Sequence, residues 1–276
     1  MTSAEGVTAG TSTAANGIRL HVVGCRRSGT TLLFELLSTC FAHDEACEHE
    51  RSIFDSPCPP GLSLSKKPSD VTHVRAAFEA DPNLYLLYVL RDPRSVVTSI
   101  HPSRPNIYFA SFERWLRYEA AATPMKRHPR FLEVRYEELV RDPLGVQQRI
   151  GGAFPFLSET HPFTEFAEHA QTAEPAAVSL LGVRPIETES RERWRQHLPR
   201  LRFQMQQYPE LATVIREYGY ESSDAWLAAL DGVAAAPQGY GERPRGRLAR
   251  MEAALRYWFK TRRYLRRARA RARARQ

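Results

Sequence analysis

The sequence has few cysteines and no long apolar run, and each absence excludes a class of protein. Its 276 residues include four cysteines, all within residues 25–58 and none in a C-x-x-C pair. That spacing fits neither a disulfide framework nor a common zinc site. The longest apolar run, residues 84–90, has seven residues, whereas a membrane-spanning helix needs roughly 18 or more. Residues 1–17 lack the basic start and the apolar stretch of a secretory signal. We therefore expect a soluble, cytoplasmic protein.

Lysine is scarce as well, and the basic charge is concentrated at one end of the chain. The sequence contains four lysines against 35 arginines, and its formal net charge is +8. Residues 245–276 alone hold thirteen basic residues and one acidic residue, a net charge of +12, so the other 244 residues carry −4. The basic character therefore belongs to the C-terminal tail. Nucleic acid is a less favoured partner, because binding it would depend on that tail alone.

Apolar strand patterns alternate with helical patterns along the chain. The strand patterns are residues 18–23, 84–90 and 131–134, and the helical patterns are residues 31–41, 70–80, 108–122, 143–150 and 191–218. This alternation predicts an α/β fold of three layers, in which helices cover both faces of a central parallel sheet. Ligands of such sheets bind at the carboxyl ends of the strands. Residues 160–190 have no clear period, and we expect them to form loops around a site.

We expect four regions along the chain. Residues 1–17 are small and polar, so they predict a disordered N-terminus. Residues 18–230 contain all the strand patterns and predict one folded domain, and residues 231–246 have the composition of a linker. Residues 247–276 predict a basic amphipathic helix and an arginine-rich tail. The Arg-Ala alternation over residues 267–275 has no apolar face, so we expect it to be disordered.

A glycine-bounded turn, Gly24–Thr31, joins the first predicted strand to the first predicted helix. In this position the backbone N–H groups and the positive end of the helix dipole favour an anion, such as a phosphate group. The spacing is similar to the P-loop pattern G-x-x-x-x-G-K-[ST], but Thr30 occupies the lysine position. The cation is instead Arg27, two residues before the second glycine. A P-loop nucleotide kinase or NTPase is therefore the alternative function, and the missing lysine disfavours it.

Two motifs resemble those of sulfotransferases that use 3′-phosphoadenosine 5′-phosphosulfate (PAPS). Residues 27–32, RSGTTL, resemble the 5′-phosphosulfate loop of that family. Arg91 follows the strand pattern at residues 84–90, and Ser99 stands eight residues later, as in the family's 3′-phosphate motif. The resemblance covers residues 18–220 and implies transfer of a sulfuryl group from PAPS to a hydroxyl acceptor of open type, without a metal. Further landmarks of the family are residues 65–68, 135–139 and 193–194.

The resemblance implies roles for individual residues. The implied catalytic residues are Arg27, Glu48 and Lys66. The implied PAPS-binding residues are Arg27, Ser28, Gly29, Thr30, Thr31, Arg91, Ser99, Tyr136 and Arg193. Arg27 would stabilise charge on the leaving phosphate, while Arg91 and Ser99 would bind the 3′-phosphate. The tyrosylprotein sulfotransferase branch also has an arginine in place of the loop lysine, so Arg27 resembles that branch. Glu48 matches the catalytic glutamate of the same branch.

The acceptor hydroxyl must lose a proton, so a general base is needed. Three neighbouring residues are candidates. Glu48 matches the tyrosylprotein branch, His49 matches the many sulfotransferases that use histidine, and Glu50 is the third. His43, Cys47 and His49 could suggest a metal site, but their spacing fits no common ligand pattern, so we expect no metal.

The C-terminal segment predicts a surface for a charged partner. Five apolar residues fall near one helical face among arginines: Leu248, Met251, Leu255, Trp258 and Leu265. A basic amphipathic helix with aromatic residues favours an anionic membrane surface, which would place the protein at the membrane periphery. Nucleic acid, an acidic partner protein and packing on the chain's own domain are the alternatives. A non-catalytic module that binds nucleotide or membrane is the alternative to an enzyme.

Overall fold

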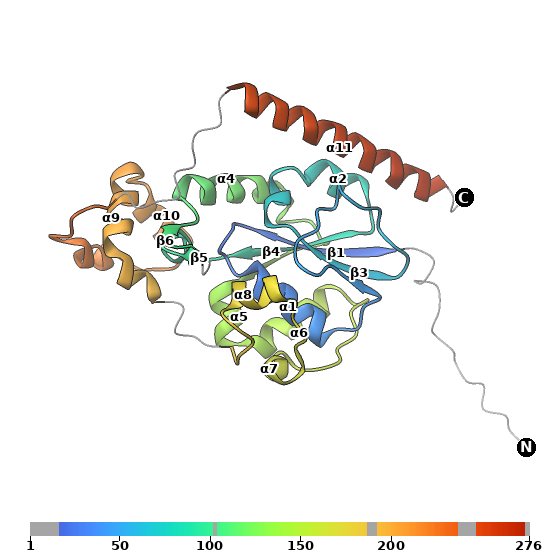
Figure 1. Ribbon diagram of the computed structural model, residues 1–276, viewed down its shortest axis with the longest axis horizontal. Coiled ribbons are helices and arrows are strands. Elements are labelled where there is room, and N and C mark those ends of the chain that lie inside the picture. The colour runs from blue at the N-terminus through green and yellow to red at the C-terminus, as the bar shows by residue number, and fades with distance from the viewer. Residues whose placement is uncertain (1–16, 102–103, 187–191, 237–246, 274–276) are drawn as a thin grey trace, which may run out of the picture.

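A computed structural model describes residues 17–101, 104–186, 192–236 and 247–273 (Figure 1). Within these residues, five strands form a parallel sheet in the order β2-β3-β1-β4-β7, and two short strands form an antiparallel pair. The sheet consists of β1 (Ile18–Gly24), β2 (Glu45–Ala46), β3 (Leu62–Lys66), β4 (Leu84–Leu90) and β7 (Phe131–Arg135), and the pair of β5 (Ile100–His101) and β6 (Arg104–Tyr108). The predicted α/β class with a central parallel sheet is confirmed.

Helices cover both faces of the sheet, which produces the expected layers (Figure 1). One face carries α1 (Thr30–Cys40), α5 (Tyr136–Arg141), α6 (Pro143–Ala153), α7 (Phe166–His169) and α8 (Glu174–Leu180). The other carries α2 (Arg75–Ala80) and α4 (Phe112–Ala122), with α11 (Arg247–Arg273) running across them. Beside β5 and β6 lie α9 (Leu198–Gln207) and α10 (Leu211–Glu217), and α3 (Pro93–Val97) follows β4. Short 3-10 helices are η1 (Pro68–Thr72), η2 (Thr123–Met125), η3 (Phe163–Glu165), η5 (Arg193–His197) and η6 (Asp224–Leu230).

Strand register brings the predicted site residues to one edge of the sheet. Gly24 of β1 lies opposite Val89 of β4, and Leu90 of β4 lies opposite Arg135 of β7. Because these strands are parallel, the segments that follow them begin at the same edge. Those segments are the glycine-bounded loop, the turn that starts at Arg91, and α5.

Alternate residues of the central strands fill two cores, one on each face of the sheet. In β4, Leu86 and Tyr88 pack in the core beneath α2 and α4, while Leu87 and Val89 pack in the core beneath α1 and α6. All four are at most 1% exposed. Because β4 is buried on both faces, its sequence is an uninterrupted apolar run and does not alternate between apolar and polar residues.

Some elements differ from the sequence-based expectation. β3 was not predicted, because Ser63 and Ser65 interrupt its apolar pattern; in the structure both are buried and hydrogen-bonded, Ser63 to the carbonyl of Ile18 and Ser65 to the ring of His21. The helix expected at residues 108–122 begins only at Phe112, because Tyr108 ends β6. Three expected descriptions are replaced. Residues 70–80 form η1 and α2, residues 192–218 contain η5, α9 and α10, and residues 160–186 contain η3, α7 and α8 with connecting segments. Residues 187–191 lie outside the described part of the chain.

The C-terminal helix packs on the domain and corrects one prediction. Residues 267–273 are helical, so the expectation of a disordered Arg-Ala segment is wrong over these residues. The reason is Asp81, just after α2, whose carboxylate accepts hydrogen bonds from Tyr264 at 2.6 Å and from Arg271 at 2.7 Å. Tyr264 and Ala268 are consequently buried. The helical period puts Tyr264, Ala268 and Arg271 on one face of α11, and that face packs on the domain beside Asp81.

Part of the expected chain organisation lies outside the described residues. The N-terminus at residues 1–16 and residues 237–246 of the linker belong to this part. The folded region before the linker ends with η6, whose Trp226 and Leu230 are buried in the core. The division into four regions stays a prediction. In the described parts of the chain, no helix is long and apolar enough to cross a membrane.

Candidate active site

The glycine-bounded loop places the N-terminus of α1 at the carboxyl edge of the sheet. Gly29, the residue before α1, has a φ of 99°, a left-handed conformation that favours glycine. A Cβ at this position would lie 2.3 Å from a ring carbon of Tyr136, so glycine is also needed for space. None of the described side chains caps α1. Its first N–H groups are therefore available to an anion in front of the loop.

A cavity of about 490 Å³ lies in front of this loop. Eight of the nine predicted PAPS-binding residues line it: Arg27, Gly29, Thr30, Thr31, Arg91, Ser99, Tyr136 and Arg193. The ninth, Ser28, is buried and does not line the cavity, and its N–H donates to the carbonyl of Cys25 at 3.1 Å. The structure therefore gathers residues from four separate segments around one space.

The two sequence motifs are in direct contact. Nε of Arg27 donates a hydrogen bond to Oγ of Ser99 at 2.8 Å, and Nη2 donates to the carbonyl of Ile100 at 3.3 Å. Nη1 of Arg91 donates to the carbonyl of Arg27 at 3.1 Å. The Arg91 guanidinium also lies 3.9 Å from the centroid of the Tyr136 ring. A phosphate-bearing ligand in the cavity would meet groups from both motifs.

The cavity has a surplus of positive charge. Burial, together with the nearby positive charge of Arg91, lowers the pKa of Arg27 to about 10. That pKa is still above neutral pH, so Arg27 remains charged beside a second guanidinium. Arg193 adds a third cation to the wall. Like charges brought together in a partly buried space are stabilised by an anion between them, which makes this an anion site.

A buried ion-pair network holds the turn that carries Arg91. Asp92 accepts a hydrogen bond from the backbone N–H of Arg94 at 2.8 Å and another from its guanidinium at 2.7 Å. Arg94 also donates to Glu221 at 2.6 Å and lies 4.4 Å from the centroid of one ring of Trp194. Sequence reasoning missed this network. Its available signal was the Asp-Pro pair before α3, which is typical of an N-cap followed by proline in the first turn.

Lys66 ends β3 beneath the loop. It is fully buried, and its Nζ donates to Oγ1 of Thr31 at 3.0 Å. Burial lowers the pKa of Lys66, while the negative charges of Glu35 and Glu50 act in the opposite direction. Thr31 lines the cavity and Lys66 does not. Lys66 therefore adjoins the cavity through Thr31.

The three candidate bases have different surroundings. Glu48 is exposed, and no described residue forms a hydrogen bond or ion pair with it. Glu50 forms an ion pair with Lys67 at 2.7 Å. Nδ1 of His49 is buried without a hydrogen-bond partner among the described residues, and burial and the charge of Lys66 lower the pKa of His49. His49 is thus neutral at neutral pH and able to accept a proton. None of the three lines the cavity, so the choice of base stays a prediction.

The far wall of the cavity was predictable only in part: residues 160–190 were expected around a site and Arg193 was a predicted PAPS-binding residue, but the other residues of the wall were not named. It comes from residues of the segments 179–186 and 193–197, together with Phe166 of α7. The first segment lies in the part of the sequence without a clear period, so no pattern placed it opposite the loop. Residues 193–194 were the landmark in this part of the chain; both line the cavity, and Trp194 is buried.

Comparisons with known proteins concern both the sequence and the fold. Residues 40–154 match the model described as the sulfotransferase family. No protein of the curated set matches the sequence. The sulfotransferase domain of the Synechococcus PCC 7002 olefin synthase is similar in structure, with 17% identity and a TM-score of 0.47 over 67% of this chain and 89% of that chain. Mouse sulfotransferase SULT7A1, complexed with PAP, is similar with 14% identity and a TM-score of 0.45 over 78% of this chain and 89% of that one.

A third similar structure is the sulfotransferase domain from the curacin biosynthetic pathway. It shares 15% identity and a TM-score of 0.46, over 64% of this chain and 90% of that chain. These scores describe a coarse likeness. The sequence match is more specific, since it spans β3, β4, β7 and α5 with Arg91, Ser99 and Tyr136. The match does not distinguish the tyrosylprotein sulfotransferase branch from other branches, so the resemblance to that branch stays a prediction. Residues 40–154, less than half of the chain, are thus similar to the sulfotransferase family.

Proposed function

We propose that the chain transfers a sulfuryl group from PAPS to a hydroxyl acceptor and releases 3′,5′-ADP. The observation that carries this proposal is the contact between the two motifs, in which Arg27 bonds to Ser99 and Arg91 bonds to the backbone of Arg27, at one cavity. PAPS and 3′,5′-ADP carry phosphate on both the 3′ and the 5′ position of one ribose. Such a nucleotide needs two anion sites close together, and these residues supply them.

The residues around the cavity fit these phosphate groups by charge and by space. The uncapped start of α1, with the hydroxyl groups of Thr30 and Thr31, suits the 5′-phosphosulfate. Arg91 and Ser99 suit the 3′-phosphate through charge-assisted and neutral hydrogen bonds. Arg27 adjoins both groups of donors, so it would stabilise the negative charge that develops on the leaving phosphate oxygen.

The reaction also requires a group that removes the proton of the acceptor hydroxyl. His49 is the candidate that the surroundings favour, because its lowered pKa keeps it neutral and its Nδ1 lacks a partner among the described residues. Glu48 and Glu50 are the alternative candidates for the base. In this scheme the hydroxyl oxygen gains the sulfuryl group, the base gains the proton, and 3′,5′-ADP leaves with the electron pair of the broken S–O bond.

Nucleotide binding measured by calorimetry tests the proposal. Without magnesium, we expect 3′,5′-ADP to bind roughly 10- to 150-fold more tightly than AMP, the equivalent of about 1.5–3 kcal/mol for a charge-assisted hydrogen bond. Arg91→Ala should remove this preference, while Arg141→Ala, at an exposed arginine of α5, should keep it. Equal affinity for AMP, or binding of ATP that requires magnesium, would contradict the proposal. Binding of 3′,5′-ADP without transfer of label from PAPS to any acceptor of a cell extract would favour a non-catalytic module.

A second proposal concerns the location of the protein: α11 binds an anionic membrane surface. Tyr257 and Tyr264 face the domain, where Tyr257 stacks on His73 and Tyr264 bonds to Asp81. The opposite face of the helix exposes four large apolar side chains: Met251 by 67%, Leu255 by 56%, Trp258 by 46% and Phe259 by 58%. Exposed arginines continue along that face toward the C-terminus: Arg262, Arg266, Arg269 and Arg273. Apolar and aromatic side chains beside arginines suit the headgroup region of an anionic bilayer.

Vesicle co-sedimentation tests the second proposal. The double variant Trp258→Ser/Phe259→Ser should lose binding to vesicles that contain phosphatidylserine, and high salt should weaken binding of the unaltered chain. The control is Leu144→Ser, which removes an apolar side chain of similar exposure, 42%, from α6. Unchanged sedimentation of the double variant would reject the membrane surface. Salt-sensitive binding to DNA but not to vesicles would assign the helix to nucleic acid.

A further inference from the structure

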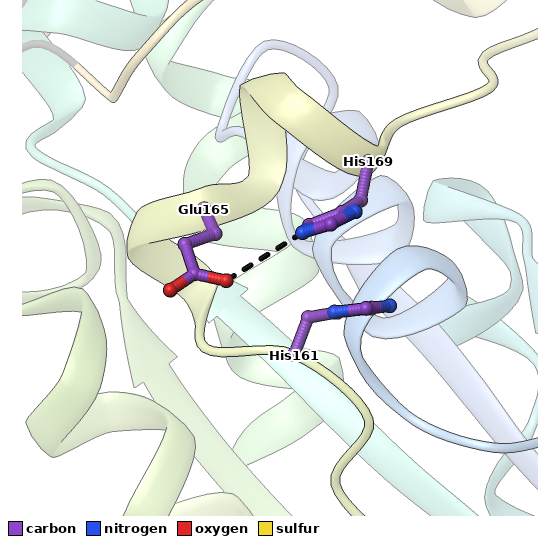
Figure 2. A group of neighbouring side chains, drawn as sticks. All are labelled: His161, Glu165 and His169. Carbon is purple, nitrogen blue, oxygen red and sulfur yellow. Dashed lines mark ion pairs between the residues drawn. The ribbon is translucent and has the colours of Figure 1, made fainter.

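Three side chains with metal-ligand chemistry meet at the surface beside η3 and α7. They are His161, Glu165 and His169, and Figure 2 shows Glu165 directed at the ring of His169, with the ring of His161 beside it. Nε2 of His169 lies 3.5 Å from Oε2 of Glu165, and the two imidazole rings stack with centroids 3.8 Å apart. One ligand atom from each residue lies within 4.8 Å of the other two.

Buried groups hold the backbone that presents this cluster. Nε2 of Gln147 donates to the carbonyl of His161 at 2.8 Å, and the N–H of Phe163 donates to Oε1 of Gln147 at 2.6 Å. Sγ of Cys40 donates to the carbonyl of Pro162 at 3.7 Å. Gln147, Cys40 and Phe163 are almost fully buried. The backbone is thus anchored to α1 and α6, while the side chains of His161 and Glu165 are partly exposed and that of His169 is exposed.

We propose that His161, Glu165 and His169 bind one divalent transition-metal ion, with zinc as the ion that suits them best. Two imidazole nitrogens and one carboxylate oxygen are ligands that zinc prefers, and three protein ligands leave a position for water. Ligand atoms at about 2.0–2.2 Å from zinc lie roughly 3.5 Å from one another in a tetrahedral site. The ligand atoms now lie within 4.8 Å of one another, and rotation of the side chains would bring them to that distance. The two imidazole rings would then leave their parallel stack, so that a nitrogen lone pair of each ring points at the ion.

The thiol of Cys40 lies close to this segment, but it donates to the carbonyl of Pro162 and is not among the side chains whose ligand atoms meet. The ligand set is therefore two histidines and one glutamate.

The ion would act on the nucleotide cavity through the turn that it closes. Phe166 lies between Glu165 and His169 in the sequence, is buried, and lines the cavity. A metal bound by His161 and His169 would join the two ends of the segment that carries Phe166. Because the segment gains a cross-link in the folded state only, the ion would stabilise this wall of the cavity.

Equilibrium dialysis of the full chain against zinc chloride, after treatment with a chelator, tests the site. We expect one zinc ion per chain. His161→Ala, Glu165→Gln and His169→Ala should each weaken binding by about 100-fold or more, at or above the loss caused by removing an outer-shell partner. The matched control is Glu168→Gln, an exposed carboxylate of the same turn, which should bind zinc like the unaltered chain.

A thermal unfolding scan supplies a second measurement that does not depend on activity. Added zinc should raise the midpoint of the unaltered chain and of Glu168→Gln, but not that of Glu165→Gln. Circular dichroism identifies any variant that fails to fold, and Glu165→Gln keeps the size of the side chain. Absence of zinc binding by the unaltered chain would overturn the proposal. Equal binding by a variant that combines His161→Ala, Glu165→Gln and His169→Ala would also overturn it, since the ion would then belong to other residues.

Discussion

Replacing Gly29 by alanine should weaken both folding and nucleotide binding, and the structure sets the size of the effect. The φ of 99° at this position costs an alanine about 1–2 kcal/mol. The added Cβ would lie 2.3 Å and 2.8 Å from two ring carbons of Tyr136, so the ring would have to move. Forcing an extra methyl group into a packed site costs about 1–3 kcal/mol. We therefore expect the free energy of unfolding to fall by about 2–5 kcal/mol.

Gly219→Ala is the matched control for this variant. Gly219 also has a positive φ, 70°, but a Cβ there meets no atom within 4 Å. Its replacement should cost only the backbone strain, about 1–2 kcal/mol. Urea denaturation of both variants gives the two losses of unfolding free energy. Their difference isolates the contact between Gly29 and the Tyr136 ring from the shared effect of backbone strain.

Nucleotide affinity provides the functional readout of the same variant. The Tyr136 ring lies 3.9 Å from the Arg91 guanidinium, so a displaced ring also displaces Arg91. Calorimetry should show affinity for 3′,5′-ADP reduced by roughly tenfold or more in Gly29→Ala, about 1.4 kcal/mol, and unchanged in Gly219→Ala. Suppose that Gly29→Ala loses no more stability than Gly219→Ala and keeps its affinity for 3′,5′-ADP. The close contact between Gly29 and the Tyr136 ring would then not matter, and the reasoning would be refuted.

Other residues allow equally direct tests. Tyr264→Phe removes a hydrogen bond from buried Asp81 and should cost about 1–3 kcal/mol in urea denaturation. Burial and Asp81 raise the pKa of Tyr264, so the folded state holds a proton that the unfolded state releases above about pH 10. Stability should therefore fall as pH rises above that value, and less steeply in Tyr264→Phe. If His49 is the base, His49→Asn should lower kcat by about 100-fold and Glu48→Gln should not, and the opposite result would assign Glu48. Because the pKa of His49 lies below 6.5, the usual value for histidine, kcat should stay constant as the pH falls to 6.5 and should decline only at lower pH, where the ring gains a proton. Lys66→Met, which keeps the length of the side chain, should lower kcat by about 100-fold through loss of the cation beneath the phosphate loop; an unchanged kcat would restrict Lys66 to packing.

Elements whose signals are local were predictable from the sequence. The apolar run at residues 18–23, the glycines after it and the leucines of α1 predicted a strand, a loop and a helix, and all three are present. β3 was missed because its serines look like a loop until their partners in the fold are known. The packing of α11 on the domain was only one of several alternatives for a similar reason, since Tyr264 bonds to Asp81 across 183 residues of sequence.

The sequence by itself determined the chemistry of the phosphate loop, with Arg27 present and the P-loop lysine absent, and the spacing of Arg91 and Ser99. Only the tertiary structure decided that Arg27 bonds to Ser99, 72 residues away, and that eight of the predicted residues share one cavity. It likewise decided which face of α11 is exposed, and it brought together the histidines and glutamate beside α7. The physical reason is one of range. Backbone propensities and loop motifs act over a few residues, whereas these contacts depend on strand register and on the packing of distant segments, which no local pattern specifies.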